Sequence, residues 1–302
     1  MRIRSILMWM LINIDMKRKN SLFFRILRVE LWKVFHNPMF WTALLIGAGF
    51  AILASFESYQ TIQELKDRIM AAQVKKYTGA SLFLLLICVA VINTGGQLLV
   101  SFWPILVAIP YGWSYCREKK TGSYLQEMIR AGRKAYFKAK YTALFLSGGL
   151  IAAFPFLLNL MINATFCPYV LPDPAAGTYP VMNGWFLSKL FYTHPWYWAL
   201  IWVGMAFLIG GVTAGLCLVP GDTFRFGTLV VLFPYALFYL IDVLLTTFVY
   251  NRISTTKMFL PSALIMAVPP SANPPWLVFT QIFIIFLLGT GIGWYWIVKH
   301  EL

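Results

Sequence analysis

Long apolar runs alternate with shorter polar segments along most of this chain. A transmembrane helix needs about 20 mostly apolar residues to cross about 30 Å of hydrocarbon, and six runs approach or exceed that length. The pattern predicts an all-α polytopic membrane protein with six transmembrane helices, at residues 39–56, 82–112, 141–162, 196–218, 227–249 and 276–298.

The second run is irregular. Its 31 residues would form a helix of roughly 46 Å, too long for one crossing and too short for two. It contains Asn93, Gln97 and Pro104, and polar or irregular backbone at membrane depth must be covered by protein or must line water. We expect either a long tilted helix with a polar kink or a broken helix along a cavity, which makes Asn93 and Gln97 candidates for a substrate pathway.

Two segments between the runs also have recognisable patterns. Residues 57–79 are polar with helical spacing and predict a short exposed helix. Residues 259–268 are apolar but too few for a crossing, and prolines flank them. We therefore expect a re-entrant or interfacial element within 251–275.

The N-terminal region predicts a helix on the membrane surface. Arg25, Arg28, Lys33 and His36 share one side of a helical stretch at 21–36 that is otherwise apolar, as in helices that lie in the interface. Pro38 then ends this helix. Residues 1–38 thus form an arm with an interface helix before a six-helix domain at 39–302. Residues 1–15 are either a surface arm or lie upstream of a start at Met16.

Composition supports the bilayer as the solvent of this chain. It is 60% hydrophobic and 12% charged, against about 25% charged in soluble domains. With the N-terminus inside, 18 of the 25 Lys and Arg residues fall on the cytoplasmic side, so both termini are expected to be cytoplasmic. Basic loops facing anionic lipid explain the net charge of +14 without nucleic acid as a partner.

The sequence offers few candidates for a catalytic, cofactor-binding or metal-binding site. The phosphate-binding pattern GxxxxGK[ST] is absent, the four cysteines are scattered, and the three histidines lie at membrane edges, so we expect no catalytic, cofactor or metal site. Asp242 is the one acid within a predicted span, which makes it a second candidate for the substrate pathway, unless Thr246 or Tyr239 simply holds it. GxxxG patterns at 211–215 and 289–293 predict close helix packing within the chain.

The segment between the second and third runs, residues 115–140, carries eight Lys and Arg against two Glu. Ser123 and Gln126 have the spacing of a capping box, and Gly132 supplies a stop. The helix between them has an apolar face formed by Tyr124, Leu125, Met128 and Ile129. Such a face needs either a partner or the lipid headgroups to cover it.

These residues carry a resemblance to a family. The succession Glu118, Thr121-Gly122, Arg133, Tyr136 and Lys140 resembles the E…GT…R…K pattern of type-2 exporter permeases of ATP-binding-cassette (ABC) transporters, and residues 30–38 resemble the interface helix of that family. There, a coupling helix between spans two and three docks in a groove of the ATPase. The resemblance implies a coupling helix within 113–140, with ATPase-coupling residues Glu118, Gly122, Tyr124, Leu125, Met128, Ile129, Arg133 and Lys140.

The resemblance also implies a function. We expect a permease subunit of an ABC exporter in the cell membrane, of the bacterial plasma-membrane type, that forms a pathway with a second copy or a related permease. The chain would not be an enzyme, because ATP and Mg would be bound by a separate ATPase subunit. The alternative is a channel or secondary transporter with no ATPase partner, although such proteins usually carry several intramembrane charges.

Overall fold

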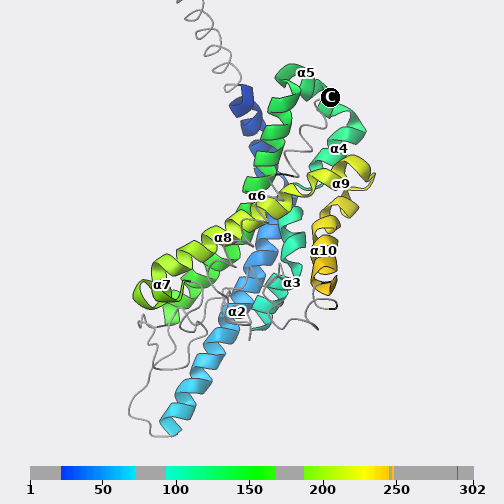
Figure 1. The fold of residues 1–302 in the computed structure, drawn as a ribbon. Coiled ribbons are helices and arrows are strands. Elements are labelled where there is room, and N and C mark those ends of the chain that lie inside the picture. Colours follow the sequence, from blue (N-terminus) through cyan, green and yellow to red (C-terminus); the bar gives the residue numbers. More distant parts are fainter. Residues whose placement is uncertain (1–21, 72–92, 168–186, 245–246, 248–290, 292–302) are drawn as a thin grey trace, which may run out of the picture.

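The computed structural model describes residues 22–71, 93–167 and 187–244, together with residues 247 and 291. The described part is helical and contains no strand. The helices are residues 22–35, α2 (Pro38–Ala71), α3 (Thr94–Ala108), α4 (Ser114–Thr121), α5 (Ser123–Ala131), α6 (Arg133–Phe166), α7 (Ser188–Thr193), α8 (Pro195–Gly215), α9 (Leu218–Thr223) and α10 (Gly227–Leu244) (Figure 1).

Three helices in the described part are long and apolar enough to cross a membrane: Pro38–Glu64, Arg133–Phe166 and Pro195–Gly221. They contain the first, third and fourth predicted spans. The shorter apolar helices Thr94–Ala108 and Gly227–Ile241 fall in the second and fifth. The sixth predicted span, apart from residue 291, and the element within 251–275 lie outside the described residues. The all-helical fold is confirmed for the described residues, and the three long apolar helices fit a membrane protein, whereas six crossings and the side of each terminus stay predictions.

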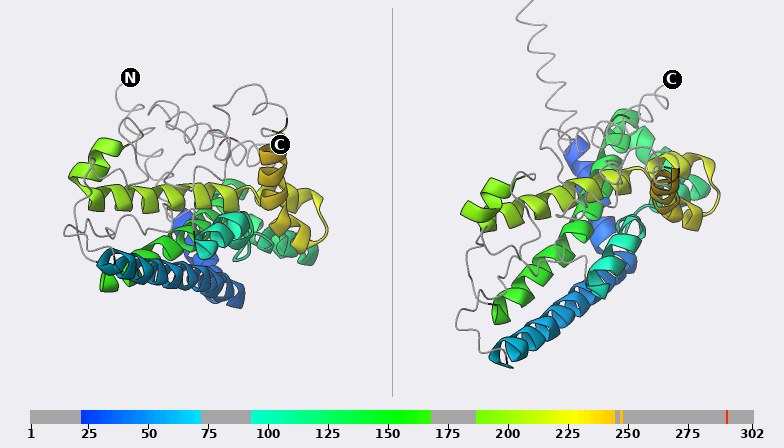
Figure 2. Two further views of the ribbon diagram at one scale, coloured as in Figure 1. Left: turned by 90° about the horizontal axis from the view of Figure 1, so that it is seen from below. Right: turned by 60° about the horizontal axis from the view of Figure 1, so that its bottom comes forward.

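The long helices form a layer in which α6 packs against α8 on one side and α2 on the other (Figure 2). Glycines permit the closest contact, because a Cβ atom added to Gly148 of α6 would lie 2.3 Å from the Cβ of Ala214 in α8. Gly211 and Gly215 of α8 abut Phe145 and Tyr141 of α6 in the same way. The prediction that the 211–215 pattern serves packing within the chain is confirmed.

The first long helix is longer than predicted. Helix α2 continues without interruption to Ala71, so residues 57–71 extend it instead of forming a separate helix; residues 72–79 lie outside the description. Its 34 residues span about 51 Å, well beyond the hydrocarbon thickness of about 30 Å. The helix continues because residues 57–71 contain no Gly or Pro to end it.

The N-terminal helix, residues 22–35, ends as the sequence predicts, just before Pro38. Asn37 fixes the junction with both halves of its amide: Oδ1 accepts a hydrogen bond from the Met39 amide at 3.1 Å, and Nδ2 donates to the Pro110 carbonyl at 2.7 Å. The helix is thereby joined both to α2 and to the segment between α3 and α4. Phe24, Trp32 and Phe35 remain exposed on its outer side, as expected for a helix in the membrane interface.

Candidate functional site: a buried ion network beneath a short exposed helix

Two glycines delimit α5. Gly122 has φ of +71° and Gly132 has φ of +81°, backbone conformations that other residues rarely adopt. The predicted start and stop of the short helix are confirmed. The predicted capping box is wrong: Gly122 holds the N-cap position, and Ser123 is the first helical residue. The Ser123 hydroxyl instead lies 3.0 Å from that of Thr121.

The predicted apolar face of α5 divides in two. Tyr124 and Met128 pack against the hydrophobic core. Leu125 and Ile129 are 48% and 84% exposed. The helix therefore has an inner apolar side that holds it to the protein and an outer apolar side that nothing in the described part covers.

A groove opens beside this outer side. Its volume is about 430 Å³, and its lining comes from α4, α5 and the first turns of α6: Tyr115, Lys119, Tyr124, Leu125, Met128, Ile129, Arg133 and Phe137. Six of these side chains are apolar or aromatic. Lys119 and Arg133 are the two cations. The groove can accept an apolar group next to a negative charge.

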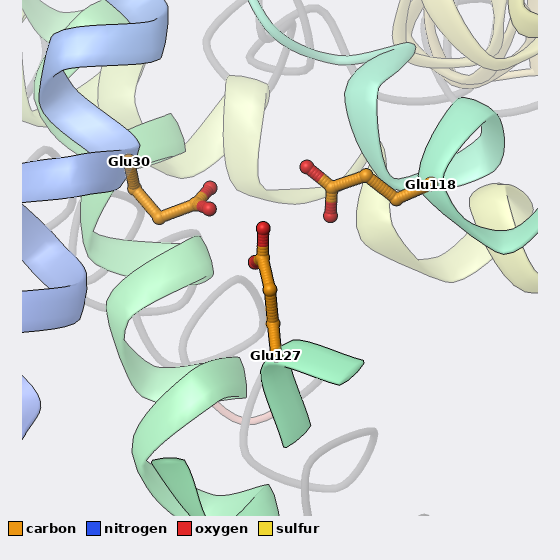
Figure 3. A group of neighbouring side chains, drawn as sticks. All are labelled: Glu30, Glu118 and Glu127. Atoms are coloured by element: carbon orange, nitrogen blue, oxygen red, sulfur yellow. The ribbon is translucent and has the colours of Figure 1, made fainter. Parts of the chain in front are cut away.

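Beneath α5, three carboxylates from distant parts of the chain point toward one another (Figure 3). Glu30 comes from the N-terminal helix, Glu118 from α4 and Glu127 from α5, and their oxygens lie within 4.8 Å of one another. The ammonium group of Lys33 contacts all three, at 2.8, 3.3 and 2.7 Å respectively. Lys33 therefore occupies the position that a metal ion bound by these carboxylates would take.

A second ammonium group completes the network from the side of α6. Lys140 Nζ lies 2.9 Å from Glu30 Oε2 and 2.6 Å from Glu118 Oε1. The side chains of Lys140 and Glu30 are wholly buried. Two phenols supply further donors: the Tyr111 hydroxyl donates to Glu30 and the Tyr136 hydroxyl donates to Glu118. The network thus joins the N-terminal helix, α4, α5 and α6.

The network contains three carboxylates and two ammonium groups, so the acids exceed the cations by one. Burial disfavours the charged form of Glu30, but Lys140 and Lys33 outweigh it and hold its pKa below the ordinary value. Burial likewise opposes the charge of Lys33, but Glu30 and Glu118 outweigh it and raise the pKa of Lys33. Both groups are charged at neutral pH. A buried pair of this kind fixes geometry, since removing either partner leaves an uncompensated charge.

Helix α4 also contacts the connection between α9 and α10. The Cys116 thiol lies 3.2 Å from the Phe224 carbonyl and can donate to it. The Lys120 ammonium lies 5.4 Å from the centre of the Phe226 ring. The α4–α5 segment and residues 224–226 are therefore neighbours at one end of the bundle (Figure 1).

The predicted coupling residues gather at this site. Glu118 and Lys140 belong to the ion network, Gly122 forms the turn before α5, and the remaining five line the groove: Tyr124, Leu125, Met128, Ile129 and Arg133. Their role in coupling to an ATPase stays a prediction.

The three candidates for a substrate pathway lie elsewhere. Asn93 is buried, and its amide donates to Ser58 Oγ at 2.8 Å and to the Ala54 carbonyl at 3.1 Å, which fixes the start of α3 against α2. Its position is that of a packing residue. Gln97 is exposed on α3. Asp242 lies in α10, and its side chain is outside the description.

The predicted coupling residues omit three of the five charged residues of the ion network: Glu30, Lys33 and Glu127. Lys33 was assigned to a basic surface with Arg25 and Arg28, but it turns inward to the three carboxylates. A signal was present for Glu30, because Leu27, Leu31 and Val34 surround it on one side of the helix. A carboxylate on an apolar helical face must find a cation or remain uncharged.

Comparisons of this chain with models of protein families, with curated proteins and with solved structures gave no match. A functional assignment therefore depends on the residues and geometry of the chain itself.

Proposed function

We propose that this protein is the membrane permease subunit of an ABC exporter, driven by a separate ATPase that docks on α5. The proposal rests on the outer apolar side of α5, where Ile129 is 84% exposed. The helix itself is held in place by the ion pair between Glu127 and Lys33. An exposed apolar surface on a fixed element is typical of a docking site.

The position of α5 favours a partner outside the bilayer. Helix α6 begins at Arg133, and its apolar run begins at Tyr141, so about 12 Å of helix separate the end of α5 from that run. The headgroup layer on each side of the hydrocarbon is about 5 to 8 Å thick. If α6 stands upright, α5 lies at the outer limit of the headgroups, where a soluble subunit can reach it.

The ion network couples a movement of α5 to the N-terminal helix and to α6. When the ATPases close on ATP, they push on α5 and on residues 220–226, which form the end of α9 and its connection to α10. Because Glu127 of α5 is paired with Lys33, a displacement of α5 moves the N-terminal helix. Because Glu118 of α4 is paired with Lys140, a displacement of α4 moves the start of α6. Helix α4 and residues 224–226 move with them, and α3 and α10, which pack against each other, follow.

The pathway itself would form between two permease copies, or between this chain and a related permease. Gln97 on α3 and Asp242 on α10 are our candidates for its lining. ATP and Mg belong to the partner ATPase. A flux driven by an ion gradient, without ATP, would instead favour the channel or secondary transporter.

Cysteine protection tests the proposal. The three cysteines in the described part, Cys116, Cys167 and Cys217, are buried, so in a Cys88→Ser background Ile129→Cys adds a thiol that is far more exposed. In inverted vesicles, a membrane-impermeant maleimide should label this thiol at least about tenfold more slowly with the ATPase bound than after its removal, because docking covers α5. Arg28→Cys, on the exposed side of the N-terminal helix, is the control and should not change. Equal labelling of Ile129→Cys in both states would contradict the assignment.

A further inference from the structure

We infer that the groove between α4, α5 and α6 receives a bulky apolar side chain of the ATPase that has a carboxylate beside it, and that this carboxylate pairs with Arg133. The inference rests on the proposed function and goes beyond it, since it states which chemistry the partner presents.

The charge around the groove is the first argument. Residues 114–140 place seven basic side chains on the surface: Arg117, Lys119, Lys120, Arg130, Arg133, Lys134 and Lys138. The two carboxylates of the same segment, Glu118 and Glu127, are both bound to lysines in the ion network. Because the network binds these two acids, the charged side chains that residues 114–140 expose on the outer surface are mainly cations. Such a surface attracts acidic partners and repels basic ones.

The shape of the groove is the second argument. Its volume of about 430 Å³ is ample for a large side chain, and its walls are mostly apolar. Apolar walls favour a side chain that leaves water on binding. Arg133 lines the groove, and its planar guanidinium can hold a carboxylate through two parallel hydrogen bonds. A partner segment with an apolar residue and an Asp or Glu nearby satisfies both features.

A lipid fits less well. Anionic headgroups would be attracted by the same cations. However, if α6 stands upright, the eight residues before its apolar run raise its start by about 12 Å, past a headgroup layer of about 5 to 8 Å. We therefore assign the groove to a protein and treat lipid binding as an outcome of the test.

Photocrosslinking in native membranes identifies what enters the groove. The probe is benzoylphenylalanine in place of Leu125, in the full-length protein, and the crosslinked product is sequenced by mass spectrometry. The expected product is a peptide of a protein that carries GxxxxGK[ST], with an apolar residue and an Asp or Glu within the crosslinked segment. A product without a peptide, or with lipid alone, would overturn the inference.

A charge reversal tests the pairing. Arg133→Glu should lower the crosslink yield at least about tenfold, because a like charge then faces the carboxylate. Lys138→Glu, at an exposed position in the same helix outside the groove, is the matched control and should have little effect. Arg133 is the first residue of α6, where a carboxylate favours the helix dipole, so loss of folding is not the expected cause. Changing the crosslinked acid of the partner to Lys should restore the yield.

The outcomes separate the two proposals. If a GxxxxGK[ST] protein is captured and Arg133→Glu behaves like Lys138→Glu, the charge pairing is wrong and the proposed function stands. If the captured protein lacks GxxxxGK[ST], both the inference about the groove and the proposed function are wrong.

Discussion

Lys33 and Glu127 lie 94 positions apart in the chain, and the ammonium group of Lys33 donates to Glu127 Oε1 at 2.7 Å. This bond ties the N-terminal helix to α5. Because Lys33 also contacts Glu30 and Glu118, a displacement of α5 changes the environment of both other carboxylates. Any partner that moves α5 therefore acts on the N-terminal helix as well.

Lys140→Met should destabilise the protein strongly. Lys140 is wholly buried against Glu30, and removing one partner of a buried ion pair costs about 3 to 5 kcal/mol, since the other charge is left unpaired. Unfolding of the purified protein in detergent measures the effect. Lys138→Met, at an exposed position in the same helix, should cost much less, because interactions of exposed charges contribute about 0 to 1 kcal/mol. Similar losses in both variants would contradict a special role for Lys140.

Glu127→Gln should loosen α5 without unfolding the protein. The Glu127 side chain is 32% exposed, so losing its charge costs less than about 1 kcal/mol of global stability. Local opening of α5 becomes easier, because Lys33 then holds it less firmly. Trypsin should cut faster at the exposed Arg130 than in the wild type. Gln126→Ala, on the exposed side of α5, should leave the cleavage rate unchanged, and equal rates in Glu127→Gln and wild type would argue against the tether.

Stability should depend on pH through Glu30. Its pKa is lowered in the folded protein, so its contribution is present above the unfolded value of 4.5 and is lost as pH falls below that value. The pKa of Lys33 is raised, so its contribution persists up to at least its unfolded value of 10.5. The unfolding midpoint should therefore stay level near neutral pH and drop below pH 4.5. In Glu30→Gln this acid drop should be smaller; an unchanged profile would count against the network.

Gly148→Val should disrupt the contact between α6 and α8. The added Cβ would lie 2.3 Å from the Cβ of Ala214 and 2.8 Å from the Gly210 carbonyl, and overpacking of this kind costs about 1 to 3 kcal/mol or more. Gly204→Ala in α8 is the control, because its Cβ meets no atom within 4 Å. It should be neutral or stabilising by up to about 1 kcal/mol, since alanine favours a helix over glycine. Thermal unfolding in detergent compares the two.

The sequence pattern predicts the local features of this fold well. Apolar runs locate the long helices, and Gly132 marks the end of α5. The start of α5 at Ser123 is also predicted, but through a capping box, whereas the structure has Gly122 with positive φ at the N-cap. The length of α2 is not predicted. The thickness of a membrane suggests an end at Phe56, but no residue there breaks the helix, which continues to Ala71.

The ion network could not be predicted in the same way. Its carboxylates, Glu30, Glu118 and Glu127, come from three helices, and only their packing brings them together. Periodicity assigns a cation such as Lys33 to the surface, whereas the acids across the contact decide where it points. Similarly, the helical face of α5 contains all four apolar residues, but it does not show that Tyr124 and Met128 pack inward.

Co-purification tests whether the outer side of α5 binds an ATPase. Leu125→Asp and Ile129→Asp each place a carboxylate on the exposed apolar side, where docking would bury it without a partner. Met128 is unsuitable because it packs on the core. Gln126→Asp adds the same charge at an exposed polar position of α5 and is the control. A polypeptide with GxxxxGK[ST] should co-purify with the wild type and with Gln126→Asp but not with Leu125→Asp or Ile129→Asp; its full retention by all four proteins would rule out docking on this side of α5.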